Sequence, residues 1–196
     1  MTNFNITNPD SIDKAYQQGL LPQRNQKNLF YQESSCRSVL KNLSLSSENR
    51  RIIRKTAPFL FELIPLTDFN YTPAIQKQIH QWVKALNWEF PTSSIRTIFT
   101  NHIFNYLAVW SDNHHHPIAY LVTYMSADIS HAAYLFYDPA YSHHDLPIRI
   151  VLQFVIGSAQ KNLKYTYLGR FSPDLGFYKR TLPGFEYFQN NQWLKY

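Results

Sequence analysis

Residues 131–168 constrain the fold more than any other part of the chain, because they read as a strand, a helix and a second strand. The segment Leu146–Leu163 is apolar around most of its circumference, which is typical of a buried helix. His131–Tyr137 before it and Lys164–Leu168 after it are aromatic-rich, as strands often are. A crossover of this length joins parallel neighbours and is right-handed, so the two strands should lie side by side.

A meander of antiparallel strands precedes this crossover. Tyr106–Trp110 and Ile118–Met125, separated by a turn at 111–117, predict a hairpin, and His131–Tyr137 adds the third strand. A meander followed by a central helix resembles the layout of the GCN5-related acetyltransferase (GNAT) fold. The predicted class is therefore α+β, a GNAT-like mixed sheet with a central helix, preceded by a small N-terminal α/β subdomain.

The most regular helix pattern begins at Thr72-Pro73, an N-cap followed by proline at the first helical position. Its apolar stripe consists of Ile75, Ile79, Trp82, Val83 and Leu86. The other elements expected in this half are a short helix or loop in 1–25, two short strands in 28–45, a basic helix in 46–55 and a strand with one buried face in 59–66. The pattern of 91–105 is ambiguous and compatible with a further helix. We divide the chain into an N-terminal subdomain, 1–66, and a GNAT-like domain, 67–196.

Composition limits the class of protein. Lys and Arg outnumber Asp and Glu by 19 to 13, a net charge of +6 that mildly favours anionic partners. The polar segment 1–17 and the short apolar runs predict neither a signal peptide nor a membrane span, so we expect a cytoplasmic protein without a membrane partner. The single cysteine, Cys36, excludes an intrachain disulfide and leaves too few thiolates for a cysteine zinc site or an iron–sulfur cluster within one chain.

The segment before the central helix argues against acetyl-CoA as the donor. Residues 141–148 contain no glycine, whereas a pyrophosphate is usually held by bare backbone N–H groups at a helix N-terminus. Asp145 adds a negative charge there, and Pro147 lacks an N–H. Acyl transfer from a different donor remains the predicted chemistry.

Four motifs resemble the aminoacyl-tRNA-protein transferases of the N-degron pathway, in their order along the chain. These are a basic helix at Ser47–Arg54, Phe136-Tyr137-Asp138-Pro139, Tyr165-Thr166-Tyr167-Leu168-Gly169, and Tyr178-Lys179 followed by Trp193. The resemblance covers residues 20–196. It implies a GNAT-like enzyme that transfers an amino acid, such as arginine or leucine, from aminoacyl-tRNA to the N-terminal α-amine of a protein, without a cofactor and as a monomer.

The chain departs from the family at three points. Of the family's Cys-x-x-Cys-Arg-x-Cys element only Cys36-Arg37 remains, a later Cys-x-Lys-Met stretch is missing, and Asp145-Leu146-Pro147 replaces Ser-Leu-Gly before the central helix. Two of these changes lie near the expected active site, so altered specificity or lost activity is open.

The resemblance assigns catalytic roles to Asp138, Tyr137 and Tyr167. A carboxylate at the end of a strand could bind or deprotonate the incoming α-ammonium group, so Asp138 is the candidate base. The alternative is that Asp138-Pro139 only makes a turn, since both residue types are common in turns. The two tyrosines could line the aminoacyl pocket or simply pack in the core.

Substrate and tRNA contacts are expected from polar and basic residues around these motifs. The expected substrate-binding residues are Leu168, Gly169, Arg170, Tyr178 and Lys179. The expected tRNA-binding residues are Arg50, Arg51, Arg54, Lys55 and Arg180, which could contact phosphates or be ordinary surface charges. His114–His116 and His143-His144 do not have the spacing of metal ligands, and Cys36 has no identifiable partner histidine for nucleophilic catalysis.

Three other functions are compatible with these residues. A CoA-dependent N-acyltransferase of the same fold would bind CoA, and a non-catalytic relative would bind tRNA and transfer nothing. A structural adaptor would do neither.

Overall fold

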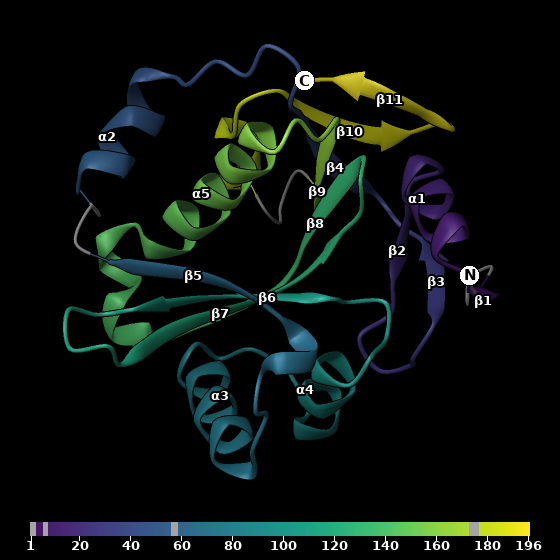
Figure 1. The fold of residues 1–196 in the computed structure, drawn as a ribbon. Helices are drawn as coiled ribbons and strands as arrows, with labels where there is room; N and C mark the ends of the chain where they lie inside the picture. Colours follow the sequence, from purple (N-terminus) through teal and green to yellow (C-terminus); the bar gives the residue numbers. More distant parts are fainter. Residues whose placement is uncertain (1–2, 6–7, 56–58, 173–176) are drawn as a thin grey trace.

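The centre of the protein is a mixed sheet with helices on both faces (Figure 1). The computed structural model describes residues 3–5, 8–55, 59–172 and 177–196. Within these residues the sheet has eight strands in the order β11-β10-β4-β9-β8-β7-β6-β5. Their bounds are β4 (Ser35–Val39), β5 (Leu60–Pro65), β6 (Tyr106–Ser111), β7 (Pro117–Met125), β8 (Ile129–Tyr137), β9 (Tyr165–Arg170), β10 (Phe185–Gln189) and β11 (Gln192–Lys195).

A second, three-stranded sheet lies at the N-terminus. It has the order β1-β3-β2, formed by β1 (Asn3–Asn5), β2 (Leu20–Pro22) and β3 (Leu29–Gln32). The helices are α1 (Pro9–Gln17), α2 (Ser47–Lys55), α3 (Pro73–Ala85), α4 (Thr92–Phe99) and α5 (Leu146–Gln160), with 3-10 turns η1 (Leu66–Asp68), η2 (Pro139–His144) and η3 (Phe177–Thr181). Within the described residues no helix is both long and apolar enough to cross a membrane.

The predicted crossover and meander are confirmed. β8 and β9 pair in parallel, with Ile129 opposite Tyr165 and His131 opposite Tyr167, and α5 connects them. β6 and β7 form the expected antiparallel hairpin, and β7 pairs antiparallel with β8. The mixed α+β sheet with a central helix is therefore the observed architecture.

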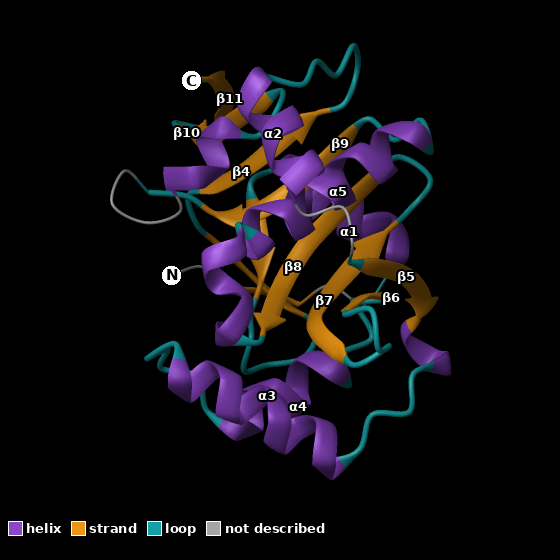
Figure 2. Cartoon of the chain, turned by 90° about the vertical axis from the view of Figure 1, so that its left-hand side faces the viewer, coloured by secondary structure: helices purple, strands orange, loops and turns teal. Residues whose placement is uncertain are grey.

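Two hydrophobic cores lie on opposite faces of the sheet (Figure 2). α3 and α4 cover one face together with α1, which contributes the fully buried Tyr16. α5 covers the other face, and Ile52 of α2 packs into that core. Because α5 touches the sheet, α2 and the C-terminal strands, most of its circumference is apolar, as expected.

Side-chain caps explain where two helices begin. Thr72 accepts a hydrogen bond from the Ile75 N–H at 3.3 Å, which confirms the predicted N-cap of α3. Ser46 and Asn49 cap each other before α2, because Ser46 Oγ accepts from the Asn49 N–H at 3.1 Å and Asn49 Oδ1 accepts from the Ser46 N–H at 3.2 Å. Asn49 also donates to the Thr181 carbonyl at 3.1 Å, which ties α2 to η3.

The N-terminal strands take places that the local pattern did not predict. The two strands expected in 28–45 exist, but β3 joins the small sheet while β4 inserts between β9 and β10. β5 is an edge strand, and Leu60 and Phe61 are 42% and 40% exposed, so its expected buried face is only partly covered. The hairpin of β10 and β11 was not predicted; Asn190 and Asn191, both at positive φ, form its turn. A division at residue 66 remains a prediction.

Gly184 tests how tightly β4 is held in the sheet. Its φ is +69°, and an added Cβ would lie 2.3 Å from the backbone oxygen of Val39. Gly184→Ala should therefore lower the free energy of unfolding by about 2–4 kcal/mol in urea titrations. Gly157→Ala in α5 is the control, since nothing lies within 4 Å of the added Cβ. It should stabilise by about 0.5–1 kcal/mol through helix propensity, and equal effects of the two variants would contradict the expectation.

Candidate active site

The parallel strands β8 and β9 diverge after three residue pairs. Their pairing ends at His131 and Tyr167, yet β8 runs on to Tyr137 and β9 to Arg170. Each strand carries a bulge just beyond this point. The register of β8 against β7 skips Ala133, and the register of β9 against β4 skips Leu168. A bulge bends its strand and increases the local twist, so the two bulges account for the separation.

His131 is the first polar group at the divergence. Its side chain is only 3% exposed, and Nδ1 lies 2.8 Å from the Tyr16 hydroxyl. Nε2 is buried and has no hydrogen-bond partner among the described residues. Burial, with a smaller effect of the nearby Lys179, lowers the pKa of His131 to about 3, so the ring is neutral at physiological pH.

Gly169 leaves a space beside this unpaired nitrogen. Its φ is +77°, which glycine adopts readily. A Cβ at this position would lie 3.8 Å from His131 Nε2 and 3.9 Å from Lys179 Nζ. An added methyl group would therefore be in ordinary van der Waals contact with both nitrogens, and we call this methyl-sized space beside Gly169 the gap.

Lys179 of η3 approaches the gap with a half-buried side chain. Nζ donates a hydrogen bond to the Arg170 carbonyl at 2.6 Å. Burial lowers the pKa of Lys179, and the neighbouring Cys36 partly opposes this shift. A lysine amine that is more easily deprotonated than usual thus lies next to a neutral imidazole.

Cys36 and Tyr178 close the gap on the side of α5. The Cys36 thiol donates to the Gly169 carbonyl at 3.3 Å, and burial raises its pKa to about 12. Burial also raises the pKa of Tyr178 to about 12, with Cys36 and Tyr137 adding to the shift. Both groups stay protonated near neutral pH, so Cys36 is a poor nucleophile, in line with its expected role as an ordinary thiol.

The sheet separates the two tyrosines that were predicted to be catalytic. Tyr167 lies in the core under α1, 4.9 Å between ring centroids from Tyr16, and burial raises its pKa to about 12. Tyr137 lies in the core under α5, because the bulge at Ala133 reverses the alternation of β8. Only Tyr137 is near Tyr178 and Cys36.

The predicted substrate residues surround the gap in different ways. Gly169 and Lys179 face it, while Leu168 is buried in the core under α5. The Arg170 side chain is exposed, with Nε 3.4 Å from Glu33 Oε1. Their roles in binding remain predictions.

Asp138 lies at the end of β8, where it begins η2. Its Oδ1 accepts a hydrogen bond from the Ala140 N–H at 2.9 Å, and its own N–H donates to the Ile118 carbonyl at 2.9 Å. The carboxylate therefore caps the turn, as the alternative interpretation of Asp138-Pro139 expected. This contact neither requires nor excludes the predicted role as a base.

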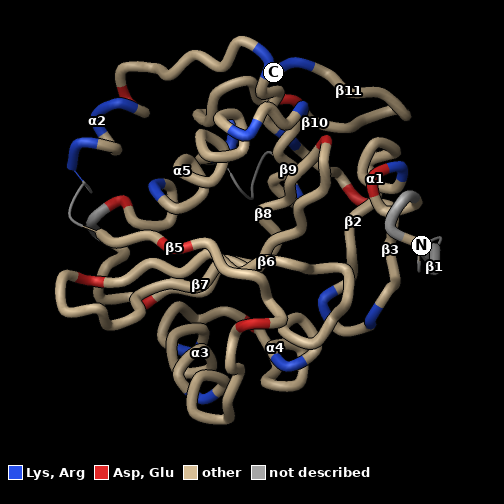
Figure 3. Tube along the Cα trace, viewed as in Figure 1, with Lys and Arg blue, Asp and Glu red and all other residues tan. Residues whose placement is uncertain are grey.

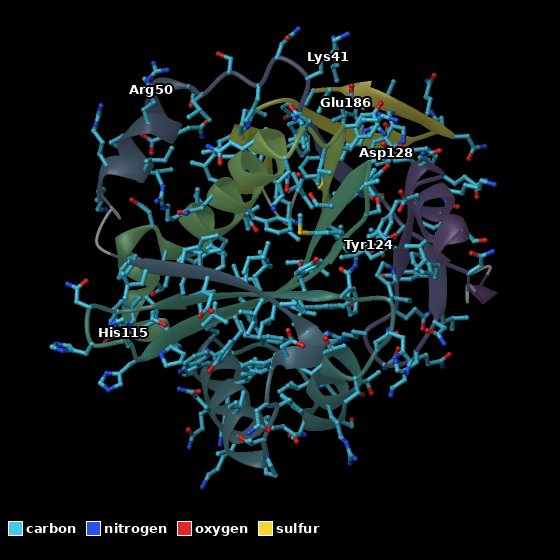
Figure 4. The ribbon with its side chains drawn as sticks, in the orientation of Figure 1. Lys41, Arg50, His115, Tyr124, Asp128 and Glu186 are labelled. Carbon is cyan, nitrogen blue, oxygen red and sulfur yellow. The ribbon has the colours of Figure 1, made fainter. Side chains whose placement is uncertain are left out.

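The basic residues of α2 are blue in Figure 3, and they differ in their ion-pair partners. Arg51 and Lys55 form ion pairs with Asp145 at 3.3 and 2.9 Å, and Arg51 also pairs with Glu48 at 2.7 Å. Arg50 and Arg54 are exposed, and Figure 4 shows Arg50 pointing away from the molecule. Arg50 donates to the Leu45 carbonyl at 2.6 Å.

Arg180, the other residue expected to bind tRNA, belongs to η3. It contacts the ring and the hydroxyl of Tyr196. The cap contact between Asn49 and Thr181 nevertheless keeps η3 next to α2, so the expected tRNA-binding residues occupy neighbouring elements.

Sequence reasoning missed His131, although its nitrogen faces the gap. A lone histidine in an aromatic strand carries no motif, and only the bulges and Gly169 reveal its position. Elsewhere, His115 projects from the β6–β7 turn in Figure 4, and the side chains of His143 and His144 lie outside the described part. The described residues contain no group of three or more His, Cys, Asp or Glu that could hold a metal ion.

Comparisons with known proteins identify the fold. No family model matches the sequence, and no curated protein matches it. The C-terminal domain of a lysylphosphatidylglycerol synthetase from Agrobacterium fabrum has a TM-score of 0.52 at 12% identity, over 86% of this chain and 54% of that one. The L-PGS from Bacillus licheniformis has a TM-score of 0.50 at 10% identity, over 82% of this chain and 60% of that one.

A third similar structure has an acetyltransferase name. It is a GCN5-related glucosamine N-acetyltransferase region of a fungal β-N-acetylglucosaminidase, with a TM-score of 0.51 at 13% identity, over 79% of this chain and 19% of that one. The predicted GNAT-like fold is thus confirmed. The chain spans between half and two thirds of the length of the two synthetase structures that it matches.

The neutral state of His131 predicts a pH effect on stability. The pKa is lowered from 6.5 in the unfolded chain to about 3 in the folded chain. Between these pH values only the unfolded chain binds the proton on His131. The contribution of this residue to the free energy of unfolding is therefore complete above pH 6.5 and is lost as the pH falls toward 3. The loss from this one group reaches about 1.4 kcal/mol per pH unit. In urea titrations His131→Gln should flatten this slope relative to wild type.

The matched control for this experiment is His102→Gln, which replaces an exposed histidine. Its stability should follow that of wild type across the same pH window. If His131→Gln and wild type lose stability in parallel below pH 6.5, the buried imidazole is not the cause.

Proposed function

We propose that this protein is an acyltransferase that moves an aminoacyl group from a charged tRNA to the N-terminal α-amine of a protein. The observation that carries the proposal is the gap beside Gly169, which the unpaired His131 Nε2 and the half-buried Lys179 Nζ both face. In the proposed reaction the ester carbonyl takes this position, between a hydrogen-bond donor and a base, at the divergence of two parallel strands.

The nature of the donor follows from the start of α5. The segment before it has no glycine; η2 fills it, and Asp145 adopts φ 60°. Arg51 and Lys55 pair with the Asp145 carboxylate, so these cations already have an anion. A pyrophosphate would meet a negative charge there, which favours a donor other than CoA. Two of the similar structures are named for lysylphosphatidylglycerol, a lipid that carries an aminoacyl group.

His131 and Lys179 have complementary roles in the proposed reaction. With Tyr16 donating its hydroxyl proton to Nδ1, the neutral imidazole carries its hydrogen on Nε2 and donates it to the ester carbonyl oxygen. Lys179, in its amine form, takes a proton from the α-ammonium group of the acceptor. The amine nitrogen attacks the carbonyl carbon, an amide bond forms, and the ester C–O bond to the ribose breaks. The nitrogen loses a second proton as the amide forms. One of the two protons reaches the departing ribose oxygen through Lys179, and the other is released to solvent.

A CoA-dependent N-acyltransferase is the second candidate, because one similar structure is a GCN5-related glucosamine N-acetyltransferase region. A thermal-shift measurement with millimolar CoA or acetyl-CoA separates the two donors. We expect no stabilisation, since the segment before α5 offers no phosphate cradle. A concentration-dependent rise in Tm would favour the CoA-dependent enzyme.

Incubation with a mixture of aminoacylated tRNAs and peptides with different N-terminal residues tests the proposed reaction directly. The peptide should gain the mass of one amino-acid residue, as read by mass spectrometry. If no peptide gains mass while a known transferase works under the same conditions, the enzymatic proposal fails. Retained tRNA binding would then indicate a non-catalytic relative.

The same assay distinguishes the two candidate bases. Lys179→Met removes the amine that faces the gap and should lower the transfer rate by about 10²–10⁴-fold. Asp138→Asn keeps an oxygen that can accept the Ala140 N–H, so it preserves the turn while removing the charge. We expect its rate to stay within about threefold of wild type, in accord with a capping role.

Two results would reverse this assignment. A large loss in Asp138→Asn with an unchanged Lys179→Met would make Asp138 the base, as the sequence motif predicts. Lys179→Arg keeps the charge but does not deprotonate at neutral pH, so it should be as inactive as Lys179→Met while unfolding at a urea concentration close to wild type. Full activity of Lys179→Arg would exclude the amine as a proton acceptor.

The exposed pair on α2 predicts a salt-dependent interaction with tRNA. Replacing both Arg50 and Arg54 by Gln should weaken tRNA binding and reduce the slope of log K against log salt by about 0.7–0.9 for each phosphate that is no longer neutralised. Arg96→Gln, which removes an exposed arginine on α4, should leave the slope unchanged. An unchanged slope in the double variant would mean that these two residues are ordinary surface charges.

A further inference from the structure

A hollow lies on the side of the N-terminal sheet, and it shares Arg170 with the end of β9. It has a volume of about 580 Å³ and is lined by Gln23, Arg24, Asn25, Tyr31, Tyr134 and Arg170. Arg170 follows Gly169 in the chain, and its carbonyl receives the hydrogen bond from Lys179. This arginine–tyrosine pocket therefore begins one residue from the gap where the acyl group would react.

The residue types in the pocket suit a nucleotide. Two guanidinium groups, those of Arg24 and Arg170, can contact a phosphate, and each side chain is exposed enough to do so. Tyr31 and Tyr134 line the pocket and are the aromatic groups on which a base could stack. The side-chain amides of Gln23 and Asn25 are groups that commonly hydrogen-bond to base edges. No carboxylate lines the pocket within the described residues, although Glu33 approaches Arg170 from outside it at 3.4 Å.

Arg24 also connects this pocket to a neighbouring hollow at the loop between α3 and α4. That hollow has a volume of about 610 Å³, and Arg24, Lys84, Trp88 and Phe90 are among its lining residues. Trp88 is 41% exposed, although tryptophan is usually covered. The Arg24 guanidinium lies 4.9 Å from the centre of the Phe90 ring. Exposed aromatic rings next to cations are the usual features of a surface that binds single-stranded nucleic acid.

We propose that the arginine–tyrosine pocket holds the 3′-terminal nucleotide of the RNA donor, with the preceding unpaired nucleotides passing Arg24 toward Trp88. This inference rests on the proposed function, since it places the donor of that reaction. The ester is attached to the terminal ribose, so the terminal nucleotide has to lie beside the gap. The pocket meets that requirement. An acidic peptide would use the two arginines but not the aromatic faces and amides.

Binding of an uncharged single-stranded CCA trinucleotide with a 5′-phosphate tests the site without any transfer reaction. Isothermal titration calorimetry should detect binding to the wild-type protein that weakens with added salt. Arg24→Gln should weaken it at least tenfold. Arg96→Gln, the matched control on α4, should stay within twofold. No binding by wild type at millimolar trinucleotide, or equal losses of affinity in the two variants, would overturn the proposal.

Two further measurements separate a base from an isolated anion. Tyr31→Leu keeps an apolar side chain but removes the aromatic face, and it should weaken the trinucleotide at least fivefold while leaving affinity for inorganic phosphate unchanged. A dipeptide with an N-terminal aspartate should not displace the trinucleotide. Full affinity of the Tyr31→Leu variant for the trinucleotide, or its displacement by the dipeptide, would overturn the proposal. Either result would indicate that the pocket binds the acidic N-terminus of an acceptor peptide.

The outcome is distinguishable from that of the proposed function. A protein that binds the trinucleotide through Arg24 and Tyr31 but transfers nothing retains the site and loses the enzymatic activity. A protein that transfers an amino acid at the same rate, and with the same KM for charged tRNA, in wild type and Arg24→Gln retains the activity and loses the site.

Discussion

The separation of β8 and β9 is the constraint on which the candidate site depends. Parallel strands normally exchange hydrogen bonds along their whole length, and here the pairing stops at His131 and Tyr167 because both strands bulge immediately afterwards. The bulge at Ala133 exchanges the faces that the later residues of β8 meet, so Tyr134 packs on the core under α1 and Tyr137 lies in the core under α5. Glycine at 169 keeps the resulting space open. Regular pairing at these positions would have produced an ordinary sheet with a closed centre.

Arg37 and Lys179 are two cations at the sheet with different surroundings, one structural and one a candidate for function. Arg37 lies between the rings of Tyr165 and Trp193, at 3.8 and 4.0 Å, and pairs with Glu186 at 2.8 Å. Its charge is fully compensated, and it holds β4, β9, β10 and β11 together. Lys179 instead donates to a carbonyl oxygen, and burial lowers its pKa. A buried cation whose partner is a neutral carbonyl has no anion to offset its desolvation, so its charged form is disfavoured. Such perturbed groups are typical of active sites.

Local patterns in the sequence predicted the elements but not the relations that build the site. The stripe of α3, the apolar α5 and the crossover follow from periodicity and connection length, which are properties of single segments. The place of β4 between β9 and β10 depends on pairing across the chain. The bulges are shifts of one residue that an aromatic-rich strand does not reveal. His131 and Lys179 are far apart in sequence, and only Lys179 belonged to a recognisable motif, so the histidine was missed.

Asp145 links the absence of a glycine loop to the charge pattern of α2. In the left-handed conformation at φ 60°, its side chain does not cap α5 and instead pairs with Arg51 and Lys55. A carboxylate thus occupies the charge-complementary position where a phosphate could otherwise sit, and the two cations are used internally. Arg50 and Arg54 keep their exposure on the outer side of the same helix. The ion pairs therefore disfavour binding of a pyrophosphate such as that of CoA at the start of α5. They leave the outer side of α2 able to contact the phosphate backbone of a tRNA.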